Sequence, residues 1–187
     1  ETYSVIFGDC IFITVRRGDS YSKEAVYVCY GVNRENKREL LGLTINPTES
    51  VSVWETLFTQ LKTRGVKNVK LVVADGIKEM EGVVLKLFPT SKFQKCVVHK
   101  MRNVLLATRP KDKAAVAEDL KHVFDNFSSD STKQKAFEKI ETFCKKWEDK
   151  YADIRRYFNA QTIEYYLTYI DFHVDVRRLI YTTNSIE

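Results

Sequence analysis

Two aspartates lie where a carboxylate is costly, in or directly after an apolar run. Asp75 follows the apolar part of LVVADG, residues 71–76, and Asp9 is the only charged residue between Val5 and Val15. Burying an isolated carboxylate costs several kcal/mol unless a cation or a hydrogen-bonding partner compensates it. The two acids are therefore candidates for a cation site. The structural alternatives are a solvated turn acid at Asp75 and, at Asp9, an edge-strand acid or the partner of a Lys or Arg.

A shared cation site requires that the strands carrying Asp9 and Asp75 are neighbours. Two carboxylates within a few ångströms repel each other unless a divalent ion neutralises them, and hard oxygen ligands favour Mg²⁺ or Mn²⁺. Asp75 also resembles the acid of a nucleoside-triphosphate site, but neither G-x-x-x-x-G-K-[ST] nor G-x-G-x-x-G occurs in the chain. Nucleotide binding through those phosphate loops is excluded.

Two further pairs have a spacing that suggests chemistry. Cys96 and His99 form C-x-x-H, but a structural zinc site needs about four ligands and no second pair has such spacing. We therefore expect a thiol and an imidazole that hydrogen-bond inward at a strand-to-helix corner. Asn184 and Glu187 have the spacing of a capping box, which predicts the start of a helix. Glu187 is then either a capping residue or a third metal ligand.

A basic segment lies in the middle of the chain. Ser91–Lys113 contains seven Lys or Arg residues and one acid, in a chain whose net charge is +5. Such a segment fits contact with a polyanion such as DNA, and a solvated helix face is the alternative. The candidate DNA contacts are Lys92, Lys95, Lys100 and Arg102.

The elements that must position these residues change character along the chain. β-branched and aromatic runs predict strands at Val5–Val15, Glu24–Val32, Glu39–Ile45, Val69–Ala74 and Lys92–Val97. Helical spacing predicts helices at about Ser50–Arg64, Gly76–Leu87 and Val98–Thr108. The first three strands favour an antiparallel meander, and the strand–helix–strand order that follows favours a parallel neighbour for Val69–Ala74.

The second half is expected to be helical. Apolar spacing predicts three amphipathic helices around Leu120–Phe127, Phe137–Trp147 and Ile163–Ile170, with a loop at Ser128–Ser131. Strands first and helices later indicate an α/β fold, a mixed sheet with helices on its faces. Ligands in such sheets collect at the carboxyl ends of parallel strands, and Asp75 lies just past one.

Composition places the chain among globular proteins. It has 187 residues, 44% of them hydrophobic, and four scattered cysteines. No apolar run is long enough to span a membrane, and scattered cysteines suit reduced thiols in the cytoplasm. Because the sequence opens with Glu1, we expect a fragment of a longer chain.

Three separated motifs carry a resemblance to a known family. They are F-P-x4-QKCVVHKMRN at Phe88–Asn103, the Asp-Gly pair at 75–76, and IYTTNSIE at Ile180–Glu187. Together they resemble bacterial insertion-sequence transposases of the Mutator-like superfamily, over essentially the whole chain. The resemblance implies an RNase H-like mixed five-stranded sheet flanked by helices, with an all-helical insertion between the second Asp and the Glu of a DDE triad.

The resemblance also assigns a site. The catalytic and metal-binding triad carried over by position is Asp9, Asp75 and Glu187. Two ions, Mg²⁺ or Mn²⁺, would be held there, one activating the attacking water or 3′-hydroxyl and the other stabilising the leaving oxygen. The residues that would support the site are Cys96, His99 and Asn184.

Organisation and partners follow from the same resemblance. The implied parts are an RNase H-like core at 1–110, a helical insertion at 111–170, and a return to the core at 171–187 that begins the Glu-bearing helix. The substrates would be transposon terminal inverted repeats and target DNA, bound by a homodimer at the bacterial nucleoid, with no membrane partner. The chain departs from the family pattern at Ile77–Met80 and His173-Val174, and most of the helix expected to hold Glu187 would lie beyond the last residue.

Two other functions fit the same acids. An RNase H-like nuclease or resolvase would cleave DNA without joining strands. A non-catalytic protein would keep the fold for DNA binding or assembly. A transposase joins pre-cleaved ends to a target, whereas a nuclease or resolvase does not. A transposase binds the metal, whereas a non-catalytic protein does not.

Overall fold

The computed structural model describes residues 2–183. The chain forms two compact units. The first runs as far as Phe93 and is joined again by Thr183, and the second is Gln94–Thr182. The division between Phe93 and Gln94 lies earlier in the chain than the expected division after residue 110. We describe each unit by itself.

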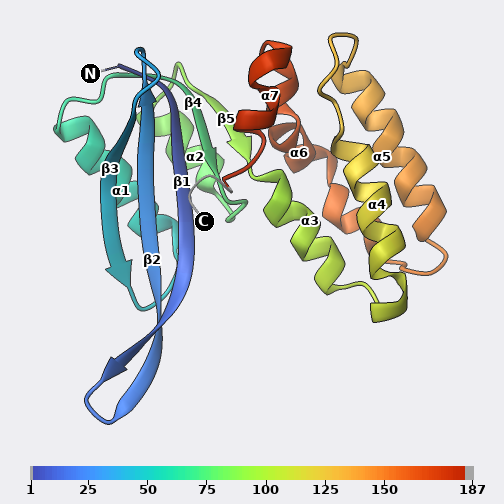
Figure 1. Ribbon diagram of the computed structural model, residues 1–187, viewed down its shortest axis with the longest axis horizontal. Helices are drawn as coiled ribbons and strands as arrows, with labels where there is room; N and C mark the ends of the chain where they lie inside the picture. The colour runs from blue at the N-terminus through green and yellow to red at the C-terminus, as the bar shows by residue number, and fades with distance from the viewer. Residues whose placement is uncertain (1, 184–187) are drawn as a thin grey trace. The chain divides into compact units, whose positions relative to one another are not determined.

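The first unit is built on a mixed sheet. Its strands are β1 (Thr2–Arg17), β2 (Ser20–Asn33), β3 (Arg38–Asn46), β4 (Asn68–Ala74) and β5 (Lys92–Lys95), which spans the division between the units. The sheet order is β3-β2-β1-β4-β5 (Figure 1). Strands β1, β2 and β3 are antiparallel, and β4 runs parallel to β1. The predicted meander, the parallel strand and the mixed five-stranded sheet are confirmed.

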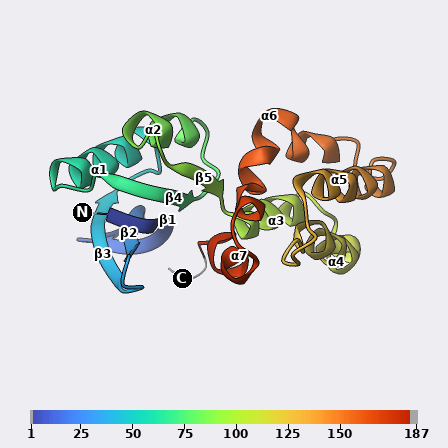
Figure 2. The same ribbon diagram turned by 90° about the horizontal axis from the view of Figure 1, so that it is seen from above.

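Two helices cover one face of this sheet, α1 (Val51–Thr63) and α2 (Met80–Leu87) (Figure 2). Helix α1 packs directly on the strands because β1 has a glycine beneath it. A Cβ atom at Gly8 would lie 2.9 Å from Cζ3 of Trp54, which is fully buried. The missing side chain therefore lets a large aromatic ring fix the position of β1 one residue before Asp9.

The start of α1 agrees with the prediction, and the start of α2 does not. Ser50 caps α1 by accepting a hydrogen bond from the Val53 amide at 3.4 Å. Helix α2 was predicted to begin at Gly76 and begins at Met80. Glu79 has a φ of 68°, a left-handed conformation that cannot continue into an α-helix on its N-terminal side. Residues 75–79 form a loop instead.

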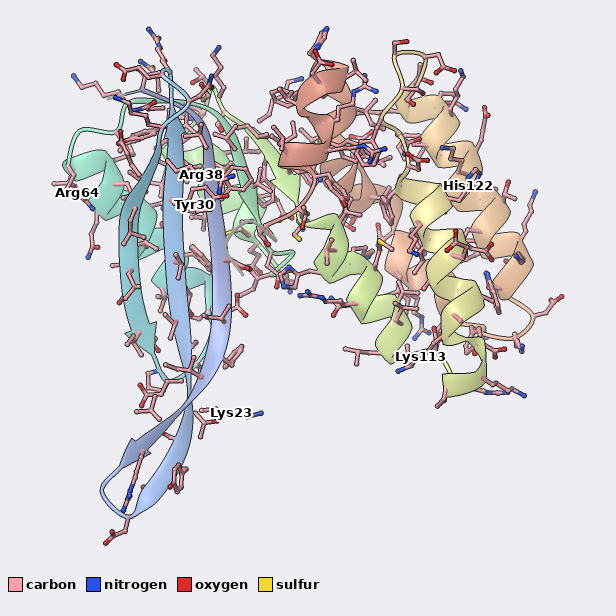
Figure 3. The ribbon with its side chains drawn as sticks, viewed as in Figure 1. Lys23, Tyr30, Arg38, Arg64, Lys113 and His122 are labelled. Atoms are coloured by element: carbon pink, nitrogen blue, oxygen red, sulfur yellow. The ribbon has the colours of Figure 1, made fainter. Side chains whose placement is uncertain are left out.

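The β1–β2 hairpin is longer than the rest of the sheet. β1 pairs with β2 as far as Arg17 and Ser20, whereas β3 pairs with β2 only up to Ala25. The distal part is therefore a two-stranded arm, on which Lys23 points outward (Figure 3). Tyr21 on this arm is 70% exposed.

The second unit is helical. Its elements are α3 (Val97–Leu106), η1 (Pro110–Asp112), α4 (Lys113–Phe124), α5 (Lys133–Trp147), η2 (Ile154–Phe158), α6 (Ala160–Ile163), η3 (Glu164–Tyr166), η4 (Thr168–Asp171) and α7 (Val174–Ile180). The first two predicted amphipathic helices are present as α4 and α5, which pack on each other. The strand before them ends at Lys95 rather than Val97, and α7 was not predicted.

The third predicted helix, Ile163–Ile170, is wrong. The segment is divided into α6, η3 and η4 because a buried side chain takes its backbone groups. The side chain of Gln94 accepts from the Tyr169 amide at 2.7 Å and donates to the Tyr166 carbonyl at 3.1 Å. These bonds replace the helical pattern that the apolar spacing suggested. Among the described helices, none is long and apolar enough to cross a bilayer.

Candidate catalytic site

The sheet places the two aspartates on neighbouring strands. In the parallel pairing of β1 with β4, the last pair is Gly8 with Ala74. Asp9, still on β1, and Asp75, the first residue after β4, come next. Because β1 continues and β4 ends here, Asp9 lies within the sheet and Asp75 at the carboxyl end of a parallel strand. This is the adjacency on which a shared cation site depends.

Both acids act on the same neighbouring thiol. The pKa of Cys10 is raised to about 12, first by burial and then by the negative charges of Glu49, Asp9 and Asp75. Asp9 itself is 1% exposed. Negative charge is therefore concentrated where β1 and β4 diverge. Glu49, just before α1, is a member of this group that the sequence analysis missed, since no motif marks it.

Asp75 is half-buried at the start of the loop that leads to α2. Its Oδ1 accepts a hydrogen bond from the amide of Gly76 at 2.5 Å. This bond orients the carboxylate with respect to its own backbone. The loop conformation, which ends in the left-handed Glu79, determines where the chain turns after the acid.

The donor set fits a hard divalent cation. Two carboxylates on adjacent strands supply oxygen ligands, and their mutual repulsion is relieved when a cation lies between them. Within residues 2–183, no group of three His, Cys, Asp or Glu residues is arranged to hold a metal. The predicted third ligand, Glu187, and the predicted supporting residue Asn184 lie outside the described residues.

Cys96 and His99 lie in the second unit. Cys96 is a buried free thiol whose Sγ is 3.5 Å from Oγ1 of Thr182. The next residue, Val97, donates its amide hydrogen to the carbonyl of Tyr181 at 2.9 Å. Cys96 therefore belongs to the point where the first and last segments of this unit meet, and His99 is half-buried one turn into α3.

Two of the predicted DNA contacts are buried. Lys95 is 3% exposed and lies over the ring of Tyr165. Lys100 is 9% exposed, and its ammonium lies 4.9 Å from the ring centre of Tyr166 and 5.7 Å from that of Phe158. Burial, and then the charge of Lys95, lowers the pKa of Lys100 to about 8. The structure thus corrects the prediction that Lys95 and Lys100 face a DNA backbone, because both ammonium groups pack against rings of their own unit.

The other two predicted DNA contacts, Lys92 and Arg102, are exposed to solvent, as contact with DNA requires. Lys92 lies at the start of β5 and Arg102 in the middle of α3. Their contact with DNA stays a prediction.

Comparison with known sequences identifies relatives over the full length of the chain. The family model described as "Transposase, Mutator family" matches residues 1–187. The transposase for insertion sequence element IS905 of Lactococcus lactis is 31% identical over 187 residues, which is 99% of this chain and 46% of that protein. The transposase for insertion sequence element IS1201 of Lactobacillus helveticus is 29% identical over 188 residues, covering 100% of this chain and 49% of that protein.

The chain spans about half the length of these curated relatives. Among solved structures, a chain from the simian T-cell lymphotropic virus intasome in complex with the PP2A regulatory subunit B56 gamma superposes with a TM-score of 0.37. The two chains are 9% identical, over 66% of this chain and 49% of the other. A likeness of this size carries no argument about function.

Proposed function

This chain belongs to the Mutator family of transposases, and we propose that it is the catalytic part of a DNA transposase whose metal ligands are Asp9, Asp75 and Glu187. The observation that supports this proposal best is the register of β1 and β4, which makes Asp9 and Asp75 neighbours. Two acids that directly follow the last pair of neighbouring strands, one of them 1% exposed, form an arrangement that stability alone does not favour.

The protein's own residues hold and orient the ligands. Trp54 packs against Gly8 and fixes β1 at the residue before Asp9. The Gly76 amide holds the Asp75 carboxylate. When bound, Mg²⁺ or Mn²⁺ would supply a Lewis acid that activates the attacking oxygen and stabilises the leaving oxygen of a phosphodiester. The same set of ligands would serve cleavage at the ends of the element and joining of the free 3′-hydroxyl to target DNA.

Contacts outside the acids would bind the DNA. We assign phosphate contacts to the exposed side chains Lys92 and Arg102 and no longer to Lys95 and Lys100. Because an element has two ends, two copies of the protein are expected in the active complex.

Joining of DNA ends tests the function. The full-length protein is supplied with pre-cleaved ends of its own element and a plasmid target in Mg²⁺ buffer. We expect joined products, and a loss of roughly a thousandfold or more in Asp9→Asn and Asp75→Asn. Asp119→Asn, which changes an acid bonded to Trp147 in the second unit, is the control for a general effect of removing a carboxylate.

Two outcomes would contradict the proposal. Cleavage without joined products would indicate a nuclease or resolvase instead. No Mn²⁺ binding by calorimetry, and no change in it on Asp75→Asn, would indicate a non-catalytic protein that keeps the fold for DNA binding or assembly.

A further inference from the structure

A groove in the second unit lies outside the candidate catalytic site. Its volume is about 650 Å³, and it is lined by α3, α4, α7 and the segment that follows α4. The floor is apolar and half-buried, with Met101 and Leu105 from α3 and Tyr181 after α7. His122, which is labelled in Figure 3, lines the groove from α4.

Cations are prominent on the groove rim. The exposed basic residues that line it are Arg102, Lys121 and Arg178. Glu118 and Asp125 also line the groove, and Glu118 is paired with Lys121 at 3.2 Å. Two further exposed basic side chains line the rim, Arg102 on α3 and Arg178 on α7.

One wall of the groove is held by a buried arginine. Arg177 is 7% exposed and donates to the carbonyls of Asn126 at 3.0 Å, Ser128 at 2.8 Å and Phe172 at 2.9 Å. These bonds attach α7 to the segment after α4, with Phe127 between the first two acceptors. Three hydrogen bonds from one side chain therefore hold this wall in a single arrangement.

On that wall a guanidinium lies over an aromatic ring. Cζ of Arg178 is 4.7 Å from the ring centre of Phe127, whose ring also contacts Tyr181 at 5.1 Å, edge to face. Arg178 is exposed, so its group is reachable from solvent while the ring supports it from behind. A planar cation backed by a ring can accept a nucleobase by stacking and a phosphate by bidentate hydrogen bonds.

We propose that this groove binds unpaired nucleotides of the DNA substrate, with a base against the Arg178–Phe127 wall and phosphates on Arg178 and Arg102. The inference rests on the proposed function and deepens it by naming the part of the DNA that the helical unit takes. Bases in a duplex are stacked on each other and do not present their faces to a groove with a half-buried aromatic floor. Unpaired bases do, and Arg102 and Arg178 at the rim supply positive charge for the phosphates of the strand.

Binding of short oligonucleotides tests this site without catalysis. The full 187-residue chain is titrated, in EDTA, into a labelled single strand of about ten nucleotides and into a blunt duplex of the same length, with fluorescence anisotropy as the readout. We expect the single strand to bind more tightly than the duplex. Arg178→Ala should weaken single-strand binding about tenfold.

Matched variants separate stacking from charge. Arg178→Lys keeps the charge but not the planar group, so we expect most of the affinity to be lost while the salt dependence is retained. Arg156→Ala removes an arginine of the same unit that is 82% exposed and paired with Asp153, and should change binding less than about twofold. Quenching of 2-aminopurine in the strand, lost in Arg178→Ala, would report the stacked base directly.

Three results would overturn the proposal. The first is an equal effect of Arg178→Ala and Arg156→Ala on single-strand binding, and the second is equal affinity for the single strand and the duplex. The third is a change of oligomeric state in Leu105→Glu with unchanged oligonucleotide binding, which would show that the groove is a contact between protein chains. Because the assay contains no metal, it is independent of the joining reaction. If the wild-type protein joins DNA ends but does not bind the single strand, this site alone is rejected. If the wild-type protein binds the single strand but joins no ends, only the proposed function is rejected.

Discussion

In the helical unit, buried charges are held by contacts of their own unit, whereas the sheet unit places a buried carboxylate beside a second acid. Arg177 donates to three carbonyls, and Asp112 accepts from Lys150 at 2.6 Å and from Tyr151 at 2.7 Å. The hydrogen bonds from Lys150 and then Tyr151 lower the pKa of Asp112. Asp9, by contrast, follows the last β1–β4 pair, Gly8 with Ala74, as Asp75 does, and the charges of both acids raise the pKa of Cys10.

If the proposed function is right, the difference separates charge that stabilises a fold from charge that would bind a metal ion. A buried ion held by several hydrogen bonds is a structural element, and removing it leaves its partners unsatisfied. Two neighbouring acids raise the energy of the folded chain unless a cation is present. Substitutions should therefore have opposite effects on stability in the two units.

The largest effect on stability is expected at Arg177. Arg177→Met leaves three carbonyls without their donor, and should lower the free energy of unfolding by about 2–4 kcal/mol. Arg178→Met, the next residue, is exposed and should change it by less than about 0.5 kcal/mol. Urea denaturation of both variants measures the difference. Equal effects would show that the buried arginine is not what holds this wall.

Asp9 should behave in the opposite way. In metal-free buffer, Asp9→Asn removes the repulsion from Asp75 and should leave the free energy of unfolding unchanged or raise it by about 1 kcal/mol. Asp112→Asn is the matched change in the helical unit and should lower the melting temperature, because two hydrogen bonds to a carboxylate are weakened. If Asp9→Asn lowers the free energy of unfolding, Asp9 is a structural charge, and the contrast between the two units is wrong.

Lys100 gives the smallest and most specific effect. Its pKa in the folded chain is lowered to about 8 from 10.5, so the unfolded chain binds more protons between these values. Stability should therefore increase as the pH rises through 8, by about 1 kcal/mol between pH 8 and pH 9. The thiols of Cys10 and Cys29, whose pKa values are raised to about 12, act in the opposite direction at high pH.

The comparison with Lys100→Met isolates the lysine, since both proteins contain the same cysteines. Chemical denaturation at several pH values is the measurement. The difference in free energy of unfolding between the two proteins should change with pH above 8. A constant difference would mean that the ammonium is not destabilised by its burial.

The sheet could be predicted because its signals are local. Runs of β-branched and aromatic residues identify the strands, and a strand–helix–strand connection restricts the direction of β4. If β1 and β4 are neighbours, these two signals predict that Asp9 and Asp75 approach each other, and the pairing shows that the two strands are neighbours. The site was predictable to that extent, and Glu49 was missed because only the three-dimensional fold brings it near Cys10.

The errors come from contacts between distant parts of the chain. The helical spacing around Tyr166 is real, but Gln94, seventy-two residues earlier, bonds the backbone there. Charge counting predicts that Lys100 is a surface cation, but its ammonium is buried and lies 4.9 Å from the ring centre of Tyr166. No window of sequence contains both partners of either contact, so neither periodicity nor charge counting can find them.

The helical unit starts and finishes at one place. Val97 is bonded to the carbonyl of Tyr181, and Cys96 contacts Thr182, so the polypeptide leaves the host fold and re-enters it through adjoining segments. Because the two ends of the unit adjoin, a change in its length would require little movement of the strands on either side. Protein engineers could use the same junction to graft a reporter or a new specificity module onto the scaffold.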